Sequence, residues 1–173
     1  MPSHPSPPRR TVPIAAETVR SIALDTGFDL VAFGPADPGE HGGHFLRWLE
    51  AGRHGEMRYL EANRERALDP TRWRPGVRST IALAVDYGGP AVGLEGGGRI
   101  ARYAGGRDYH RWLRERVFTL RERLEAAGVP HGSMNGGTDA VPLLERALAT
   151  RAGIGFLAKS AMVISPTHGP YLQ

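Results

Sequence analysis

The most informative feature of this 173-residue chain is what it lacks, because it contains no cysteine. Without a thiol, the chain cannot form disulfides, ligate zinc or an iron–sulfur cluster through thiolates, or use a cysteine nucleophile. Lysine is almost absent as well: the sequence has 21 arginines and a single lysine, Lys159. A compact ammonium behaves differently from a guanidinium fork, although a coding preference for arginine would also produce this ratio. His41 and His44 have no third ligand nearby, so we predict no metal site.

Long hydrophobic runs are also missing. No apolar stretch approaches the roughly 20 residues needed to cross a bilayer, and no apolar segment typical of a secretory signal follows the first arginines. Five of the first 13 residues are proline, which predicts a disordered lead-in over residues 1–13. Residues 14–173 are enough for one domain with a sizeable core. We therefore expect a soluble, cytoplasmic protein with no membrane partner.

The charge is moderately positive, with a net value of +4. Between Arg47 and Arg78 there are eight arginines against five acidic residues. Arginine suits phosphate recognition because its fork binds two oxygens at once. Most of these arginines alternate with glutamates, however, and such a pattern is also typical of a solvated helix face. Contact with nucleic acid is therefore permitted by the composition but not required by it.

Alternating helical and strand patterns predict an α/β fold with a central mixed sheet covered by helices on both faces. The longest predicted helix carries an apolar stripe from Tyr109 to Leu124. Helices are expected at residues 14–26, 45–49, 57–68, 106–127 and 142–152. Strands are expected at residues 28–33, 81–85, 99–104, 129–131 and 161–165.

The segment from Thr138 to Ser160 holds the most distinctive local pattern. Asp139 stands three residues before Pro142 and an apolar stripe, which favours an N-cap of a helix with the proline in its first turn. A carboxylate on such a loop can also face a cleft and do chemistry, so both readings stay open. The glycines at 153 and 155 match the dinucleotide fingerprint G-x-G-x-x-A. That fingerprint must follow a strand, and here it follows a helix, so we reject it.

Four segments, taken in order, resemble the N-terminal half of the epoxyqueuosine reductases. They are HGEMRYL at 54–60, RERALDPTRWRPGVRSTIAL at 64–83, RYAGGRDYHRWLRERV at 102–117 and TDAVPLLERALATRAGIGFLAKSAMVI at 138–164. The last two contain the long motifs Y-A-x-G-x-D-Y-H and D-x-x-P-x-x-E-R, and the resemblance covers residues 14–172. It implies a nitroreductase-like cobalamin-binding domain. This family reduces the epoxide of epoxyqueuosine in a tRNA anticodon to queuosine, with cobalamin and two [4Fe–4S] clusters.

The resemblance also implies roles for individual residues. Asp139 matches the family's proton donor, a general acid whose pKa should be raised by burial. For Tyr109, which begins the apolar stripe, simple core packing is an equally good explanation. The residues implied to bind cobalamin are Arg66, Arg102, Tyr103, Tyr109, His110, Lys159, Ser160 and Val163.

The sequence departs from the family pattern around its lysine and in its cysteines. Ala158, Phe156 and Ser160 stand where the family usually has glycine, tryptophan and asparagine or histidine. The family's cluster-binding cysteine motifs are absent, so the [4Fe–4S] clusters cannot be bound by this chain. We therefore expect an iron–sulfur partner protein or a further C-terminal segment to supply electrons. Two alternatives stay open: a non-catalytic tRNA- or RNA-binding module, and a flavin-type reductase on a similar scaffold.

Overall fold

The centre of the molecule is a pair of antiparallel strands, β1 (Leu30–Pro35) and β2 (Ser79–Ala84). The computed structural model describes residues 13–90, 93–94, 96–139 and 141–173, so the predicted lead-in lies almost entirely outside the described residues. In the register of the two strands, Val31 lies opposite Leu83. Successive side chains of a strand point to opposite faces, so this pair has two distinct surfaces.

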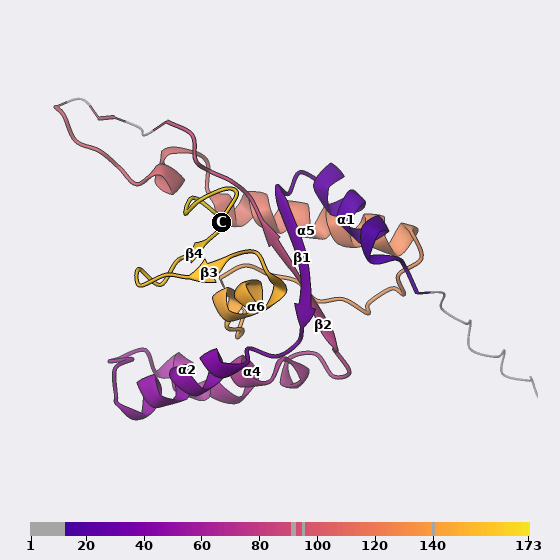
Figure 1. The fold of residues 1–173 in the computed structure, drawn as a ribbon, viewed down its shortest axis with the longest axis horizontal. Helices are drawn as coiled ribbons and strands as arrows, with labels where there is room; N and C mark the ends of the chain where they lie inside the picture. The colour runs from indigo at the N-terminus through magenta and orange to yellow at the C-terminus, as the bar shows by residue number, and fades with distance from the viewer. Residues whose placement is uncertain (1–12, 91–92, 95, 140) are drawn as a thin grey trace, which may run out of the picture.

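One surface packs against two helices, α1 (Ala16–Asp25) and α5 (Tyr109–Ala126) (Figure 1). The apolar stripe of α5 forms the core with α1 and β1, as the sequence predicted. Leu124 is the largest fully buried side chain of this cluster. The fully buried members are Val19, Ala23, Phe28, Val31, Leu113, Leu120 and Leu124.

The other surface of the strand pair packs against α6 (Glu145–Ala152). Small side chains at Ala32, Gly34, Ala82 and Ala84 share this surface because they alternate with the core-facing residues. A methyl group built on Gly34 would lie 3.0 Å from the Cα of Ala152. The helix therefore lies very close to the strands, and this closeness depends on glycine at position 34.

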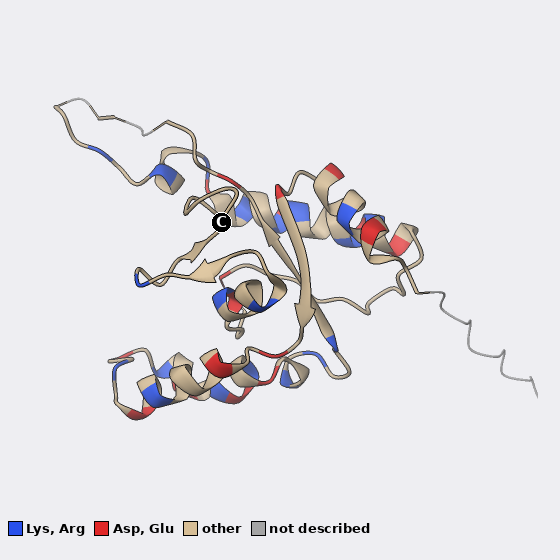
Figure 2. Ribbon diagram, viewed as in Figure 1, with Lys and Arg blue, Asp and Glu red and all other residues tan. Residues whose placement is uncertain are grey.

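The connection between β1 and β2 forms a separate helical layer. It contains α2 (Glu40–Glu50), α3 (Arg58–Ala62), α4 (Arg64–Leu68) and the short 3₁₀ turn η1 (Pro70–Arg72). The helix expected at 57–68 is thus split at Asn63, whose side-chain amide donates to the carbonyl of Tyr59. Basic and acidic residues are mixed over this layer in Figure 2.

A short hairpin, β3 (Phe156–Leu157) and β4 (Val163–Ile164), follows α6. Gly153 ends α6 with φ of 90°, the left-handed geometry that glycine adopts readily. At Gly155 a Cβ would lie 2.1 Å from the carbonyl oxygen of Ile164, so only glycine fits there. The last residues then return to the centre, where the backbones of Val85 and Gln173 exchange two hydrogen bonds.

The described residues do not form the single mixed sheet that the sequence predicted. They form two separate two-stranded antiparallel sheets, β1–β2 and β3–β4. Helices do cover both faces of the β1–β2 pair, so that part of the prediction is confirmed. Residues 129–131 are not a strand, since Pro130 lacks the N–H that a ladder needs. Residues 99–104 contain only an isolated bridge at Arg99, followed by the 3₁₀ turn η2 (Arg102–Gly105). The nitroreductase-like assignment stays a prediction.

Across the described part of the chain, no helix combines the length and the apolar character needed to cross a membrane.

Candidate active site

Asp139 lies on the loop between α5 and α6, where its backbone has φ of 55°. Its carboxylate oxygen Oδ2 accepts a 2.9 Å hydrogen bond from the hydroxyl of Tyr109. The helix begins only at Glu145, and Leu144 occupies the N-cap position. The cap interpretation of Asp139 was therefore wrong, as was the placement of Pro142 in the first helical turn. The carboxylate is directed toward α5 instead.

His110 is the second contact of Asp139. Its Nε2 lies 3.4 Å from Oδ2 of Asp139, and its ring stacks on Tyr109 with centroids 4.0 Å apart. The other ring nitrogen, Nδ1, lies 2.8 Å from Oδ1 of Asp108, which also accepts the backbone N–H of His110. Asp108 is the N-cap of α5. A carboxylate on Nδ1 favours the tautomer with its proton there, which leaves the Nε2 lone pair facing Asp139.

Burial and the neighbouring charges divide these groups into proton donors and acceptors. Burial and the bond to Asp139 raise the pKa of Tyr109 to about 12, so its hydroxyl donates at neutral pH. The hydrogen bonds from His110 hold the pKa of Asp108 below its usual value, so Asp108 is ionised. Burial, followed by the charge of Asp139, raises the pKa of Glu145 to about 7. The site thus combines a fixed anion, a tyrosine donor and a carboxyl group that titrates near neutrality.

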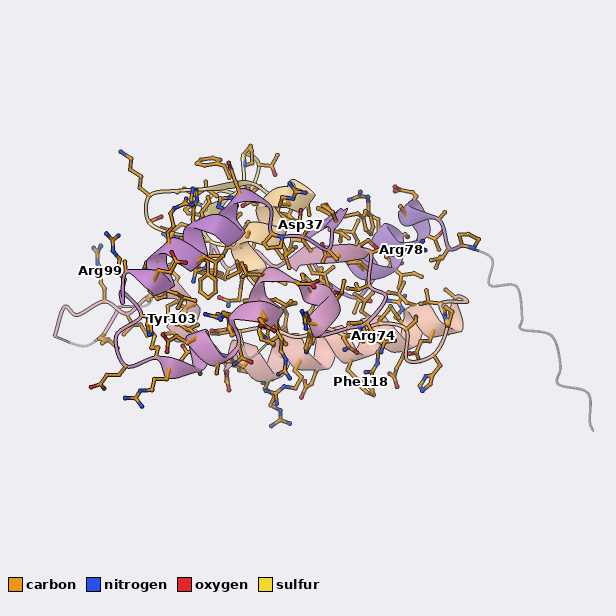
Figure 3. The ribbon with its side chains drawn as sticks, turned by 90° about the horizontal axis from the view of Figure 1, so that it is seen from below. Asp37, Arg74, Arg78, Arg99, Tyr103 and Phe118 are labelled. Atoms are coloured by element: carbon orange, nitrogen blue, oxygen red, sulfur yellow. The ribbon has the colours of Figure 1, made fainter. Side chains whose placement is uncertain are left out.

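An open pocket lies next to this cluster. Its volume is about 380 Å³. Tyr103 connects it to the cluster, since its ring meets the Tyr109 ring edge-on with centroids 6.2 Å apart. Arg99 and Tyr103 lie at the same end of the molecule in Figure 3. The lining residues are Tyr87, Arg99, Ile100, Ala101, Arg102, Tyr103 and Tyr171.

Arg102 is occupied by structural contacts at the rim of this pocket. Its guanidinium donates to the carbonyl of Gly88 at 3.1 Å and lies 4.1 Å from the ring centroid of Tyr171. These contacts join η2 to the C-terminal residues, since Tyr171 is hydrogen-bonded through its carbonyl to the N–H of Tyr87. The pocket therefore forms only after residues far apart in the sequence have come together.

The other predicted site residues occupy two further places. Lys159 and Ser160 are exposed in the turn between β3 and β4, and Val163 is half-buried on β4. Arg146 fixes this turn to α6 by donating to the carbonyl of Ala161 at 2.6 Å. Arg66 is exposed on α4, whose main contacts are with η1, α2 and α3. The structure therefore brings together Asp139, Tyr109, His110 and Tyr103, and it places Arg66 in a different layer.

Sequence reasoning missed two residues of this site, Asp108 and Glu145. Asp108 had a local indication, because an aspartate directly before a helix is a common N-cap. For Glu145 no local indication existed. Its role appears only because the loop folds back, so that its Oε1 accepts the N–H of Asp139 at 3.0 Å.

Comparisons with known proteins agree on one family. Residues 67–139 match the family model described as epoxyqueuosine reductase QueG, DUF1730. An epoxyqueuosine reductase of Pseudomonas aeruginosa is 36% identical over 168 residues, covering 90% of this chain and 45% of that protein. A solved epoxyqueuosine reductase bound to an epoxyqueuosine-modified tRNA-Tyr stem loop superposes with a TM-score of 0.74 at 27% identity, covering 90% of this chain and 42% of that one.

A second solved structure concerns the catalytic loop. It is an epoxyqueuosine reductase of Bacillus subtilis whose aspartate-bearing catalytic loop is swung out of the active site, and it superposes with a TM-score of 0.70 at 26% identity. The match covers 91% of this chain and 42% of that one. The resemblance found in the sequence is thus confirmed: the chain is similar to the epoxyqueuosine reductases, and it spans slightly less than half the length of the proteins it matches.

Proposed function

We propose that this chain forms the proton-donating and substrate-binding part of an epoxyqueuosine reductase that acts on tRNA. The observation that carries the proposal is the cluster in which Asp139 meets both Tyr109 and His110. The relative solved with an epoxyqueuosine-modified stem loop supports tRNA as the substrate. The Bacillus relative, whose catalytic loop bears an aspartate, supports a catalytic role for the Asp139 loop.

The reaction requires acid catalysis. Conversion of epoxyqueuosine to queuosine removes the epoxide oxygen as water and leaves a carbon–carbon double bond, which takes two electrons and two protons. The oxygen becomes strongly basic as the ring opens, so a carboxylic acid within hydrogen-bond reach accelerates the step. Asp139 supplies the first proton to that oxygen. Tyr109 donates to Oδ2 and so holds the carboxyl group against the first turn of α5.

His110 restores the proton that Asp139 gives away. Its Nε2 lies 3.4 Å from the carboxylate, a distance that a small movement brings within reach of proton transfer. Asp108 stabilises the imidazolium form through Nδ1 and holds the ring in orientation. The three residues therefore make a path along which a proton passes from solvent, through the exposed imidazole, to the acid.

The residues present fit one wall of a cobalamin site. A corrin is a broad, flat and largely apolar ring with polar groups at its edge, so it needs a wide slot with a polar rim. The pocket of about 380 Å³ is too small to enclose it. The β3–β4 hairpin, however, exposes Phe156 at 55%, together with Leu157 and Met162, an apolar surface of the required kind.

Tyr103, Val163 and the hairpin would hold one face of this cofactor, with Lys159 and Ser160 at its rim. When bound, a reduced cobalamin would supply electrons for cleavage of the carbon–oxygen bond. Arg102 contributes indirectly, because it fixes Tyr171 at the edge of the pocket. Arg66 lies in a different layer, and we assign it to the arginine-rich surface available to the tRNA backbone.

The electrons must enter from outside this chain. Its lack of cysteine excludes thiolate-bound iron–sulfur clusters. We propose that a cluster-bearing segment or partner protein delivers them, and that the chain alone turns over only with a chemical reductant.

The first test is a titration of the purified chain with cobalamin, followed by visible absorbance. A saturable spectral change is expected, and its absence would remove the cofactor half of the proposal. With reduced cobalamin, a strong chemical reductant and an epoxyqueuosine stem loop, queuosine formation is then measured by mass spectrometry. Asp139→Asn should lower the rate by about 100-fold or more, since that is the usual contribution of a general acid. An unchanged rate would refute the role of Asp139.

A non-catalytic RNA-binding module is the second candidate, favoured by the 21 arginines. It predicts stem-loop affinity that falls steeply with salt, is the same with or without the epoxide and is unaffected by Asp139→Asn or by cobalamin. Affinity that depends on the epoxide would exclude this reading. A yellow rather than a red copurifying chromophore would instead support the flavin-type alternative.

A further inference from the structure

The loop that carries Asp139 is fixed partly by a residue to which no role in the reaction has been given. Glu145, the first residue of α6, accepts the backbone N–H of Asp139 at 3.0 Å, across six positions of the chain. Asp139 has φ of 55°, in the left-handed region, which costs a residue with a side chain some free energy. The hydrogen bond to Glu145 offsets this cost. It therefore fixes the backbone conformation from which the carboxylate meets Tyr109.

We propose that Glu145 is the positioning residue of this site, which holds the Asp139 loop in place while its carboxyl group is uncharged and loosens it on ionisation. This inference rests on the proposed function, because it concerns the geometry of the proposed acid. Glu145 does not touch the reacting atoms and acts through the backbone of Asp139.

The charges around Glu145 give the direction of the effect. Its own burial and the negative charge of Asp139 raise the pKa of Glu145 to about 7, while the Asp139 N–H and the positive charge of Arg146 oppose the shift. Tyr109 and His110 of α5 contact the carboxylate of Asp139, and they influence Glu145 through that carboxylate. The ionised carboxylate is thus the form that the folded loop disfavours, since two like charges then lie on adjoining segments.

Uncharged Glu145 still accepts the N–H of Asp139 through its carbonyl oxygen, and the repulsion is then absent. Below pH 7 the loop is held, and above pH 7 it loosens. The proposed acid is consequently best positioned below pH 7.

The test follows the backbone amide of Asp139 by ¹⁵N NMR in the full chain without cofactor. In the unmodified protein its chemical shift should titrate with a midpoint near pH 7. Its hydrogen-exchange protection, corrected for the intrinsic rate, should fall about tenfold from pH 6 to pH 8. Glu145→Gln keeps an uncharged acceptor, so protection should persist at both pH values and the midpoint should disappear. Glu145→Ala should lose about tenfold of the protection even at pH 6.

Two matched variants separate this effect from others. His110→Gln removes the imidazole that contacts Asp139, and the midpoint should remain. Glu115→Gln changes an exposed glutamate of α5, and the Asp139 amide should behave as in the unmodified protein. A midpoint that follows His110, or full protection in Glu145→Ala, would overturn the proposal. These readouts need neither cobalamin nor tRNA, so a failed cofactor titration would leave them informative.

Discussion

Asp108 has two functions at the site, one in the backbone and one toward a side chain. Asp108 binds both the backbone N–H and the Nδ1 of His110 through one oxygen, Oδ1. A single aspartate therefore begins α5 and also orients the imidazole. Asparagine would keep the first of these functions, because it is as good an N-cap as aspartate. The two functions can thus be separated by one substitution.

Asp108→Asn should leave the free energy of unfolding within about 0.5 kcal/mol of the unmodified value. The rate of queuosine formation should fall about 10- to 100-fold at pH 7, because the imidazolium form of His110 loses its anionic partner. The rate is measured at pH 5.5 and at pH 7 in both proteins.

Asp69→Asn is the matched control, since Asp69 caps η1 in the same way by accepting the N–H of Thr71. Asp69 lies outside the cluster, so its substitution should change neither the rate nor the pH profile. Equal effects of the two asparagine variants would show that Asp108 acts only as a cap.

At the scale of the elements, α5 connects the core to the site. Its apolar stripe packs on α1 and β1, and its first turn presents Tyr109 and His110 to Asp139. This explains why core packing and a site role for Tyr109 are compatible. The ring lies against the core cluster, and the hydroxyl at its tip bonds to the carboxylate. A substitution that loosens the packing of this stripe should therefore disturb the geometry of the site and also lower the free energy of unfolding.

Leu124→Ala should lower the free energy of unfolding by about 2–5 kcal/mol, because Leu124 is 2% exposed and its removal leaves a cavity. Urea denaturation followed by circular dichroism measures this. Leu24→Ala on α1 makes the same chemical change at a side chain that is 44% exposed, and should cost under about 1 kcal/mol. Equal losses would contradict the core described above.

At the scale of the whole molecule, the sequence predicted individual helices and strands better than the way in which they pack together. The long helix, expected over 106–127, runs from Tyr109 to Ala126, and its buried stripe was predicted correctly, since both depend on a repeat within one segment. The single sheet was wrong because strands at 99–104 and 129–131 were inferred from short apolar runs, and strand pairing depends on partners distant in the chain. The local pattern left a chemical role of Asp139 open, the family resemblance implied that it is the proton donor, and this role stays a prediction. Asp108 had a local indication as the N-cap of α5, whereas the contact of Glu145 with Asp139 depends on a folded-back loop that no local pattern encodes.

The stability of the whole molecule should depend on pH through Glu145. Its pKa is 4.5 in the unfolded chain and about 7 when folded, so the folded state binds the proton more tightly. The associated stability is fully present below pH 4.5 and is lost as the pH rises through 7. The free energy of unfolding should therefore fall between pH 4.5 and 8 by on the order of 2–3 kcal/mol more in the unmodified protein than in Glu145→Gln.

Denaturant titrations at pH 5 and pH 8 measure this difference. The histidines and the other acids titrate in both proteins, so their contributions cancel in the comparison. If the free energy of unfolding changed equally with pH in the unmodified protein and in Glu145→Gln, Glu145 would already be ionised at neutral pH.

The close approach of α6 to the strand pair has a consequence for the evolution of this fold. A Cβ on Gly34 would lie 3.0 Å from the Cα and 3.1 Å from the backbone N of Ala152, so there is no room for it unless the helix moves. Glycine at 152 would not relieve this contact, because those backbone atoms would remain. Among related sequences position 34 should therefore be glycine wherever α6 lies this close to the strands. A displaced α6 would also move Glu145, its first residue, which accepts the N–H of Asp139. Evolutionary change at Gly34 in β1 is therefore coupled to the geometry of the loop that carries Asp139.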